Sequence, residues 1–207
     1  MECKTPTAGI VLAAGTSSRF GKLKQLQVID EKSLLEWTLD ACLGSQLEHI
    51  FVVLGFRREK IIQALSRKFR NPRITVVFNP DYRNGQSTSL HAGIHAAKHA
   101  YSSVMFVLGD QPFIDCVTLD ILLERFLASG KNICVPFYNG KRGNPVIFSK
   151  KFYAEITHIE GDVGARRIID DNPSQVLSIA LSRPSFFYDV DTIEDIEKMC
   201  ALKKVDE

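Results

Sequence analysis

The chain has 207 residues, of which 45% are hydrophobic and 24% charged, and its formal net charge at pH 7 is +2. This small charge argues against a nucleic-acid or membrane partner, and no apolar run approaches the roughly 20 residues of a membrane span. The five cysteines form no C-x-x-C pair, which argues against a zinc knuckle or a disulfide framework. Because the first residues show no secretory pattern, we expect a single cytoplasmic domain over residues 1–207.

Short apolar runs alternate with helical patterns, as is typical of an α/β fold with a mostly parallel sheet. The predicted strands are Ala8–Ala13, His49–Leu54, Ile74–Phe78, Val104–Leu108, Asn132–Pro136, Pro145–Phe148 and Val176–Ile179. The predicted helices are Ser33–Leu43, Arg58–Phe69, Leu90–Ala100, Val117–Ala128, Gly164–Ile169 and Ile193–Ala201. Open α/β sheets bind ligands beyond the carboxyl ends of their strands, so the loops after Ala13 and Leu108 can meet in one cleft.

The first of these loops is the most informative stretch of the chain. The sequence from Leu12 to Lys24 reads L-A-A-G-x-S-x-R-x-G-x-x-K, an apolar strand that opens into a loop with glycines and cations. Backbone N–H groups of such a turn can face an anion, and Arg19 and Lys24 can neutralise it. Neither the Walker pattern nor the dinucleotide G-x-G-x-x-G pattern is present. We therefore expect a phosphate-binding loop of another kind.

Carboxylates follow two other predicted elements. Asp110 stands at the tip of a buried strand, in Leu108-Gly109-Asp110-Gln111-Pro112, and it can hold a divalent metal or simply close a turn. Asp189 and Asp191 are two residues apart, so they share one face of an extended segment. Either one could supply a second metal ligand, or it could stabilise the start of the last helix.

Three polar loops complete the candidate site. Asn84 to Gly93 follows a strand and opens a helix, so its amides and hydroxyls could read a nucleobase, although Ser87 or Ser89 could instead cap the helix. The loops Gly140 to Val146 and Gly161 to Arg167 combine glycines with basic side chains, which suits an anionic acceptor. Both could also be ordinary solvated segments.

Together, these motifs resemble those of the MobA-like family of molybdenum-cofactor nucleotidyltransferases, over nearly the whole chain. Within that family they are most similar to the CTP-using molybdopterin cytidylyltransferases, because Leu12-Ala13-Ala14-Gly15 stands where the guanylyltransferases usually have L-A-G-G. The resemblance implies a Rossmann-like three-layer fold with a mostly parallel central sheet. Its N-terminal half would bind the nucleotide and its C-terminal half the acceptor.

The resemblance also implies roles for individual residues. The nucleotide would be held by Leu12, Ala13, Ala14, Gly15, Arg19, Lys24, Asn84, Gly85, Ser87, Ser89 and Asp110. The catalytic residues would be Arg19, Lys24 and Asp110, and Mg²⁺ would be bound by Asp110 with Asp189 or Asp191. The acceptor would face Gln111, Pro112, Gly143, Asn144, Pro145, Asp162 and Arg166. Relatives often have histidine in place of Asn144, so the acceptor is specified less firmly than the nucleotide.

The implied reaction is the Mg²⁺-dependent transfer of CMP from CTP to the terminal phosphate of molybdopterin, with release of pyrophosphate. An anionic phosphate needs no strong general base, which fits a sequence without a Ser-His-Asp pattern. The alternatives are a guanylyltransferase or another NTP transferase on this fold, an NADPH-dependent reductase, and a non-catalytic protein that delivers the cofactor. A molybdenum hydroxylase would be the partner that receives the product.

Overall fold

The computed structural model describes residues 6–16, 23–161, 164–182 and 195. The predicted helix Ile193–Ala201 therefore lies outside the described residues, apart from Asp195. The predicted site residues Arg19, Asp162, Asp189 and Asp191 lie outside them as well. No helix within the described ranges combines the length and the apolar character needed to cross a bilayer.

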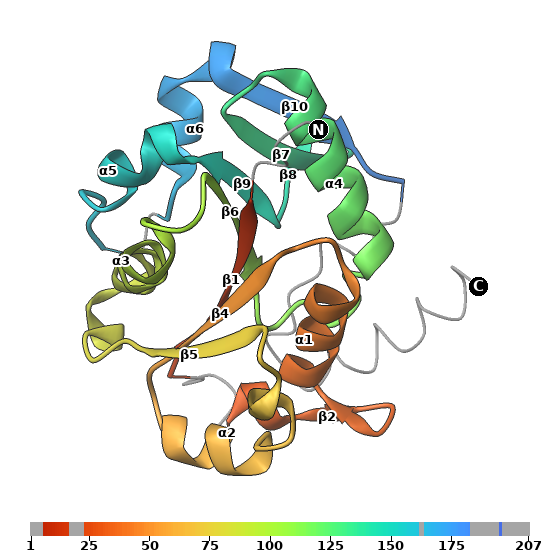
Figure 1. Cartoon of the computed structure of the whole chain (residues 1–207), viewed down its shortest axis with the longest axis vertical. Coiled ribbons are helices and arrows are strands. Elements are labelled where there is room, and N and C mark those ends of the chain that lie inside the picture. The colour runs from red at the N-terminus through yellow and green to blue at the C-terminus, as the bar shows by residue number, and fades with distance from the viewer. Residues whose placement is uncertain (1–5, 17–22, 162–163, 183–194, 196–207) are drawn as a thin grey trace.

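A single eight-stranded sheet forms the centre of the molecule (Figure 1). Its strands are β1 (Thr7–Ala13), β4 (His49–Leu54), β5 (Ile74–Phe78), β6 (Ser103–Leu108), β7 (Ile133–Tyr138), β8 (Lys141–Arg142), β9 (Val146–Ser149) and β10 (Val176–Ala180). The order is β10-β7-β9-β6-β1-β4-β5, with β8 paired to β7. Only β8 and β9 run antiparallel to their neighbours among these strands, so the predicted α/β class with a mostly parallel sheet is confirmed.

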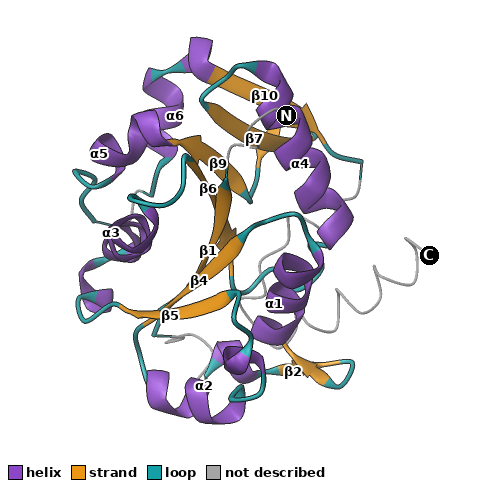
Figure 2. Ribbon diagram, viewed as in Figure 1, coloured by secondary structure: helices purple, strands orange, loops and turns teal. Residues whose placement is uncertain are grey.

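Helices cover both faces of this sheet and give the molecule three layers (Figure 2). One face carries α1 (Leu34–Gly44), α2 (Arg58–Ala64) and α4 (Cys116–Ser129), and the other carries α3 (Gln86–Ala97), α5 (Tyr153–Ile156) and α6 (Arg166–Asp171). A small hairpin, β2 (Val28–Ile29) and β3 (Lys32–Ser33), leads into α1. This arrangement is the Rossmann-like fold that the sequence predicts.

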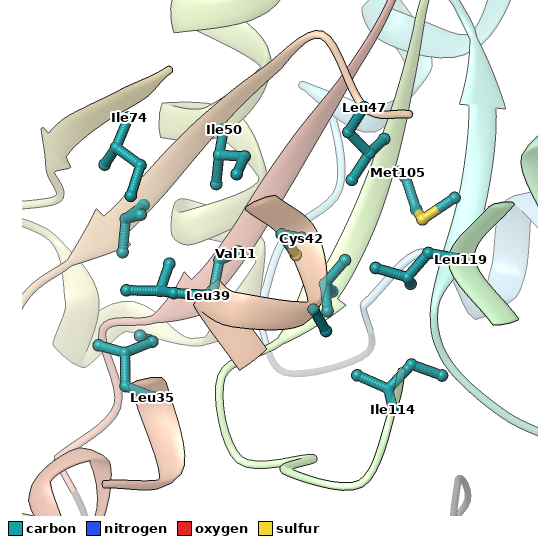
Figure 3. Close-up of a cluster of buried hydrophobic side chains, with 14 of the residues drawn as sticks. Val11, Leu35, Leu39, Cys42, Leu47, Ile50, Ile74, Met105, Ile114 and Leu119 are labelled. Atoms are coloured by element: carbon teal, nitrogen blue, oxygen red, sulfur yellow. The ribbon is translucent and has the colours of Figure 1, made fainter. Parts of the chain in front are cut away.

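Side chains along each strand alternate between the two faces of the sheet, and this divides the hydrophobic core into two clusters. In β4, Ile50 and Val52 face the cluster beneath α1 and α4, whereas Phe51 and Val53 face the cluster beneath α3. Successive strand residues point to opposite faces, so a strand buried on both sides reads as a continuous apolar run. Figure 3 shows the first cluster, where Leu39 of α1 lies over the sheet. All these side chains are at most 7% exposed.

Several predicted boundaries need correction. The second helix ends at Ala64, and a short 3₁₀ turn over Lys68–Arg70 follows it, because Leu65 leaves the helical region (φ −104°). The third helix begins at Gln86, four residues before the predicted start, and ends at Ala97. The predicted loop between β7 and β9 contains the short strand β8. By contrast, the helix predicted from Ser33 does start there: Ser33 caps α1 and forms a capping box with Glu36.

Candidate active site at the carboxyl edge of the sheet

After β1 the chain adds β4 and β5 on one side of it and then β6 on the other side, so the direction of strand addition reverses between β1 and β6. This junction between β1 and β6 is where an α/β sheet usually binds its ligand. The Gly109 N–H donates to the Leu12 carbonyl (3.0 Å), so the chain after β6 stays against the end of β1. A Cβ at Gly109 would lie 3.0 Å from the Ala13 Cβ and 3.1 Å from the Leu12 carbonyl oxygen. Glycine at this position therefore permits the close approach that brings Asp110 beside the first loop.

Lys24 and Asp110, which the sequence predicts as catalytic residues, form an ion pair. The Lys24 Nζ lies 2.7 Å from the Asp110 Oδ2, and the two side chains are 13% and 31% exposed. Lys24 begins a 3₁₀ turn, η1 (Lys24–Leu26), that follows the phosphate loop in sequence. The other carboxylate oxygen of Asp110, Oδ1, is buried and has no hydrogen-bond partner among the described residues.

Gln25 is the functional candidate that the sequence analysis missed. Its side chain is 6% exposed, and its Nε2 donates to the carbonyls of Ala13 (3.0 Å) and Gly15 (3.2 Å). The Phe56 N–H donates to the carbonyl between them, that of Ala14 (3.3 Å). In the sequence, Gln25 stands out only as part of Lys24-Gln25-Leu26, which supports the family resemblance; its contacts come from the folded loop.

The second predicted nucleotide loop lies at the start of α3. Gly85 has a φ of 105°, which glycine adopts without strain, and α3 begins at the next residue. Ser87 and Ser89 therefore lie inside the first turns of α3 and do not cap it. Both are buried, and the Ser89 hydroxyl accepts a hydrogen bond from the Asn79 Nδ2 (3.0 Å). Asn84, by contrast, is exposed at the surface of the loop.

Several of the predicted acceptor residues lie beside other strands at the same edge of the sheet. β9 runs antiparallel to β6 with Val146 opposite Phe106, so the chain enters β9 where β6 ends. Asn144 and Pro145 consequently lie at the edge that carries Asp110, and the peptide bond between them is cis. The preceding Gly143 donates its N–H to the Pro136 carbonyl (2.9 Å) of β7.

Two of the predicted loops contact each other. The Ser87 N–H in the first turn of α3 donates to the Gly161 carbonyl (3.1 Å), which joins the predicted nucleotide loop to the predicted acceptor loop. Arg166, the first residue of α6, is exposed, whereas Gln111 and Pro112 are buried after β6. The roles assigned to these residues stay predictions, since their placement alone identifies no ligand.

Asp110 has the properties expected of a magnesium ligand. Its buried Oδ1 is a hard oxygen donor without a partner among the described residues, and Mg²⁺ commonly uses one or two carboxylates together with substrate phosphates. The described residues contain no cluster of three or more potential metal ligands. A Mg²⁺ site here would thus combine Asp110 with oxygens of the substrate, and the predicted second ligands lie outside the described residues.

The two buried cysteines, Cys42 and Cys134, are unsuited to act as nucleophiles. Burial raises the pKa of the Cys42 and Cys134 thiols to about 12, so neither supplies a thiolate near pH 7. Both side chains belong to the hydrophobic core beneath α1 and α4. The charged groups found at this edge include those of Lys24 and Asp110, beside the loop around Gly15.

Relatives of known name span most of the chain. It is 25% identical over 188 residues to the molybdenum cofactor cytidylyltransferase of Escherichia coli K12, covering 90% of this chain and 91% of that one. It is 27% identical over 200 residues to the nicotine blue oxidoreductase of Paenarthrobacter nicotinovorans, covering 92% and 95%.

Comparison of structures gives the same relationship. The crystal structure of Rv0371c from Mycobacterium tuberculosis H37Rv is 25% identical and superposes with a TM-score of 0.82, covering 95% of this chain and 99% of that one. Residues 9–176 match the family described as the MobA-like NTP transferase domain, which includes both strands of the junction, η1 and the loop after β6. The chain belongs to the MobA-like NTP transferase family.

Proposed function

We propose that this protein transfers CMP from CTP to the terminal phosphate of molybdopterin, releasing pyrophosphate and forming the cytosine dinucleotide cofactor. The observation that carries the proposal is the Lys24–Asp110 pair beside the Gly15 loop. An ammonium group and a carboxylate side by side at this junction would suit a triphosphate and a divalent metal, which supports the proposal. The named activity of the E. coli relative supports the choice of CTP and molybdopterin.

The residues on the nucleotide side act by binding and by neutralising charge. The Lys24 ammonium would exchange its contact with Asp110 for triphosphate oxygens, because a triphosphate offers more negative charge than one carboxylate. Backbone N–H groups of the Gly15 loop would add hydrogen bonds to the same phosphates. Asp110 would hold Mg²⁺, which supplies further neutralisation of phosphate oxygens when it is bound.

The chemical step follows from the charge of the acceptor. An oxygen of the terminal phosphate attacks the α-phosphorus of CTP and forms a new P–O bond. The bond from the α-phosphorus to the bridging oxygen breaks, and pyrophosphate leaves with the electron pair. The attacking oxygen is already anionic at neutral pH, so the reaction requires in-line positioning rather than a general base.

The acceptor would occupy the β9 side of the same edge. Asn144 and Pro145 lie there beside the end of β6, and Arg166 presents an exposed cation at the start of α6. We assign these residues, with Gln111, Pro112 and Gly143, to the pterin phosphate. The product would pass to a molybdenum hydroxylase, and no nucleic acid or membrane takes part in this scheme.

Ligand-induced stabilisation tests the nucleotide part of this proposal first. The thermal midpoint of the purified chain is measured with CTP, GTP, ATP, UTP or NADPH, each with and without Mg²⁺. A ligand at 100 times its Kd stabilises a protein by about 2.7 kcal/mol. A shift specific to CTP with Mg²⁺ supports the proposal. A shift with GTP alone indicates a guanylyltransferase. A shift with NADPH that needs no Mg²⁺ indicates a reductase, and the Paenarthrobacter relative is named as an oxidoreductase.

A second measurement tests the acceptor. Pyrophosphate release is followed with CTP, Mg²⁺ and molybdopterin, and then with a sugar phosphate in place of molybdopterin. Release that depends on molybdopterin supports the transferase. Tight molybdopterin binding without pyrophosphate release would overturn the catalytic proposal in favour of a delivery protein.

A further inference from the structure

The Gly15 loop has an unusual feature, in that three consecutive backbone carbonyls are anchored by the protein. The Ala13 and Gly15 carbonyls each accept a hydrogen bond from the Gln25 Nε2, at 3.0 and 3.2 Å. The Ala14 carbonyl accepts one from the Phe56 N–H at 3.3 Å. One side chain therefore supplies two of the three anchors, using both hydrogens of its amide nitrogen.

Anchored carbonyls also fix the direction of N–H groups. In a planar trans peptide, the C=O and the N–H of the following residue point in opposite directions. The bonds to Gln25 and Phe56 thus determine where the N–H groups of Ala14, Gly15 and Thr16 point. Backbone N–H groups whose directions are already fixed can bind an anion without first losing conformational freedom.

The surroundings of Gly15 leave room for an anion. A Cβ built at Gly15 would meet no described atom within 4 Å, whereas a Cβ at Gly55 would lie 2.8 Å from the Ala14 carbonyl oxygen. Among the described residues, the loop is thus packed at the Ala14 carbonyl and leaves space beside Gly15. Gly15 and Thr16 are both exposed.

From these contacts we infer that Gln25 is a positioning residue for the triphosphate. It fixes the peptide groups of the Gly15 loop, and its place in η1 keeps the adjacent Lys24 beside that loop. Its effect is to pre-organise the loop, so that little conformational freedom is lost when phosphates bind. The inference rests on the proposed function only in taking this loop as the triphosphate site.

The test uses inorganic tripolyphosphate with Mg²⁺ as the probe, because it carries no base and is independent of the choice between CTP and GTP. Its Kd for the full chain is measured by calorimetry for wild type, Gln25→Met and Gln27→Met. Methionine keeps the length of glutamine and removes its N–H donors. Gln27 is a matched control in the same segment, because its Nε2 donates only locally to the Leu23 carbonyl (3.2 Å).

We expect Gln25→Met to weaken tripolyphosphate binding about tenfold or more, and Gln27→Met to change it less than about twofold. Amide exchange at Ala14, Gly15 and Thr16, measured without ligand, should be faster in Gln25→Met alone. With CTP as substrate, KM should rise more than kcat falls. Equal affinity of Gln25→Met and wild type would overturn the positioning role.

Two further controls separate positioning from general stability and from the proposed function. Ile156→Val is a conservative change in the core beneath α3, where the side chain is fully buried. A loss of affinity in Ile156→Val equal to that in Gln25→Met would overturn the inference. If Gln25→Met does not fold, Gln25→Leu removes the same donors without adding a charge and takes its place. Wild type that binds no tripolyphosphate would instead overturn the assignment of the loop itself.

Discussion

The two sides of the candidate site are built differently. On the nucleotide side, the polar contacts are enclosed: Gln25 is 6% exposed, and the Lys24 side chain in its ion pair is 13% exposed. On the acceptor side, the ion pair that joins β8 to α6, Arg142–Asp170, has side chains that are 43% and 58% exposed. Enclosed contacts fix geometry, whereas exposed ion pairs contribute little and tolerate change.

This contrast fits the range of named activities among the relatives. A rigid loop at the switch point of the sheet can stay constant while surface loops beyond β7 and β9 vary and take different acceptors. We therefore expect substitutions on the nucleotide side to have large effects and substitutions on the acceptor side to have small, selective ones. Four variants test this expectation, together with one comparison outside the candidate site.

Asp110→Ala should have the largest effect. It removes the carboxylate that we assign to Mg²⁺, which is worth several kcal/mol of transition-state stabilisation, or about 10³-fold in kcat/KM. Asp115→Ala is the control, because Asp115 caps α4 through the Thr118 N–H (2.7 Å) and its loss is expected to lower folding stability. Steady-state turnover and urea unfolding are measured for both. Unchanged turnover in a folded Asp110→Ala protein would contradict the proposed function.

Lys24→Gln should come next. The loss of one cation facing the triphosphate is expected to lower kcat/KM for CTP about 10²-fold, close to 2.7 kcal/mol. Lys32→Gln is matched to it, because Lys32 also forms an ion pair (with Asp40, 2.8 Å) but lies in the β2–β3 hairpin. If Lys24→Gln and Lys32→Gln keep the same kcat/KM for CTP, Lys24 does not contact the triphosphate.

Gly93→Ala tests how tightly the nucleotide side is packed. A Cβ at Gly93 in α3 would lie 2.4 Å from the Ile10 Cγ2 of β1, the strand that leads into the Gly15 loop. Overpacking should lower the free energy of unfolding by about 1–3 kcal/mol, although alanine is the better helix former. Urea unfolding measures this loss, with the exposed His95→Ala as control. A Gly93→Ala protein as stable as wild type would mean that α3 can move away from β1.

Much of this architecture could be predicted from the sequence, for identifiable reasons. The strands His49–Leu54 and Ile74–Phe78 match β4 and β5 to the residue, because buried strands are short apolar runs between polar turns. The predicted helix starts at Ser33, which is the cap of α1, because a capping residue is a local signal. The hairpin β2–β3 was missed, since strands of two residues carry no periodicity.

The candidate site was predictable where it depended on motifs and not where it depended on tertiary contacts. Lys24 and Asp110 were chosen from separate motifs, and the fold joins them across 86 residues. The role of Gln25 depends on carbonyls that the fold places beside it, the first of them 12 residues earlier. The start of α3 depends on the positive φ of Gly85, which a pattern of apolar residues does not reveal.

Asp40→Asn is a comparison outside the candidate site, where the carboxylate pairs with Lys32 and Lys68, and its effect should depend on pH. Partial burial raises the pKa of the Asp40 carboxyl. Hydrogen bonds and charges from Lys32 and Lys68 lower this pKa by more than burial raises it, so the pKa lies below its usual value. The carboxylate therefore stabilises the folded state above its unfolded pKa of about 3.9, and this contribution is lost as the pH falls through the folded pKa. We expect Asp40→Asn to cost up to about 1 kcal/mol at pH 7 and progressively less as the pH falls through the folded pKa, measured by urea unfolding. A cost that persists at the lower pH would show that packing, not charge, stabilises this contact.

Arg166→Gln should have the smallest effect and the most selective one. Arg166 is exposed at the start of α6, so its loss should leave the free energy of unfolding unchanged within about 0.5 kcal/mol. If its guanidinium meets the acceptor phosphate in a solvated site, KM for molybdopterin should rise about threefold while KM for CTP stays constant. Arg167→Gln is the matched control, because Arg167 is the next residue and is directed to Asp171 (3.5 Å). An equal rise in both KM values would remove the distinction between the two sides, since it would place Arg166 on the nucleotide.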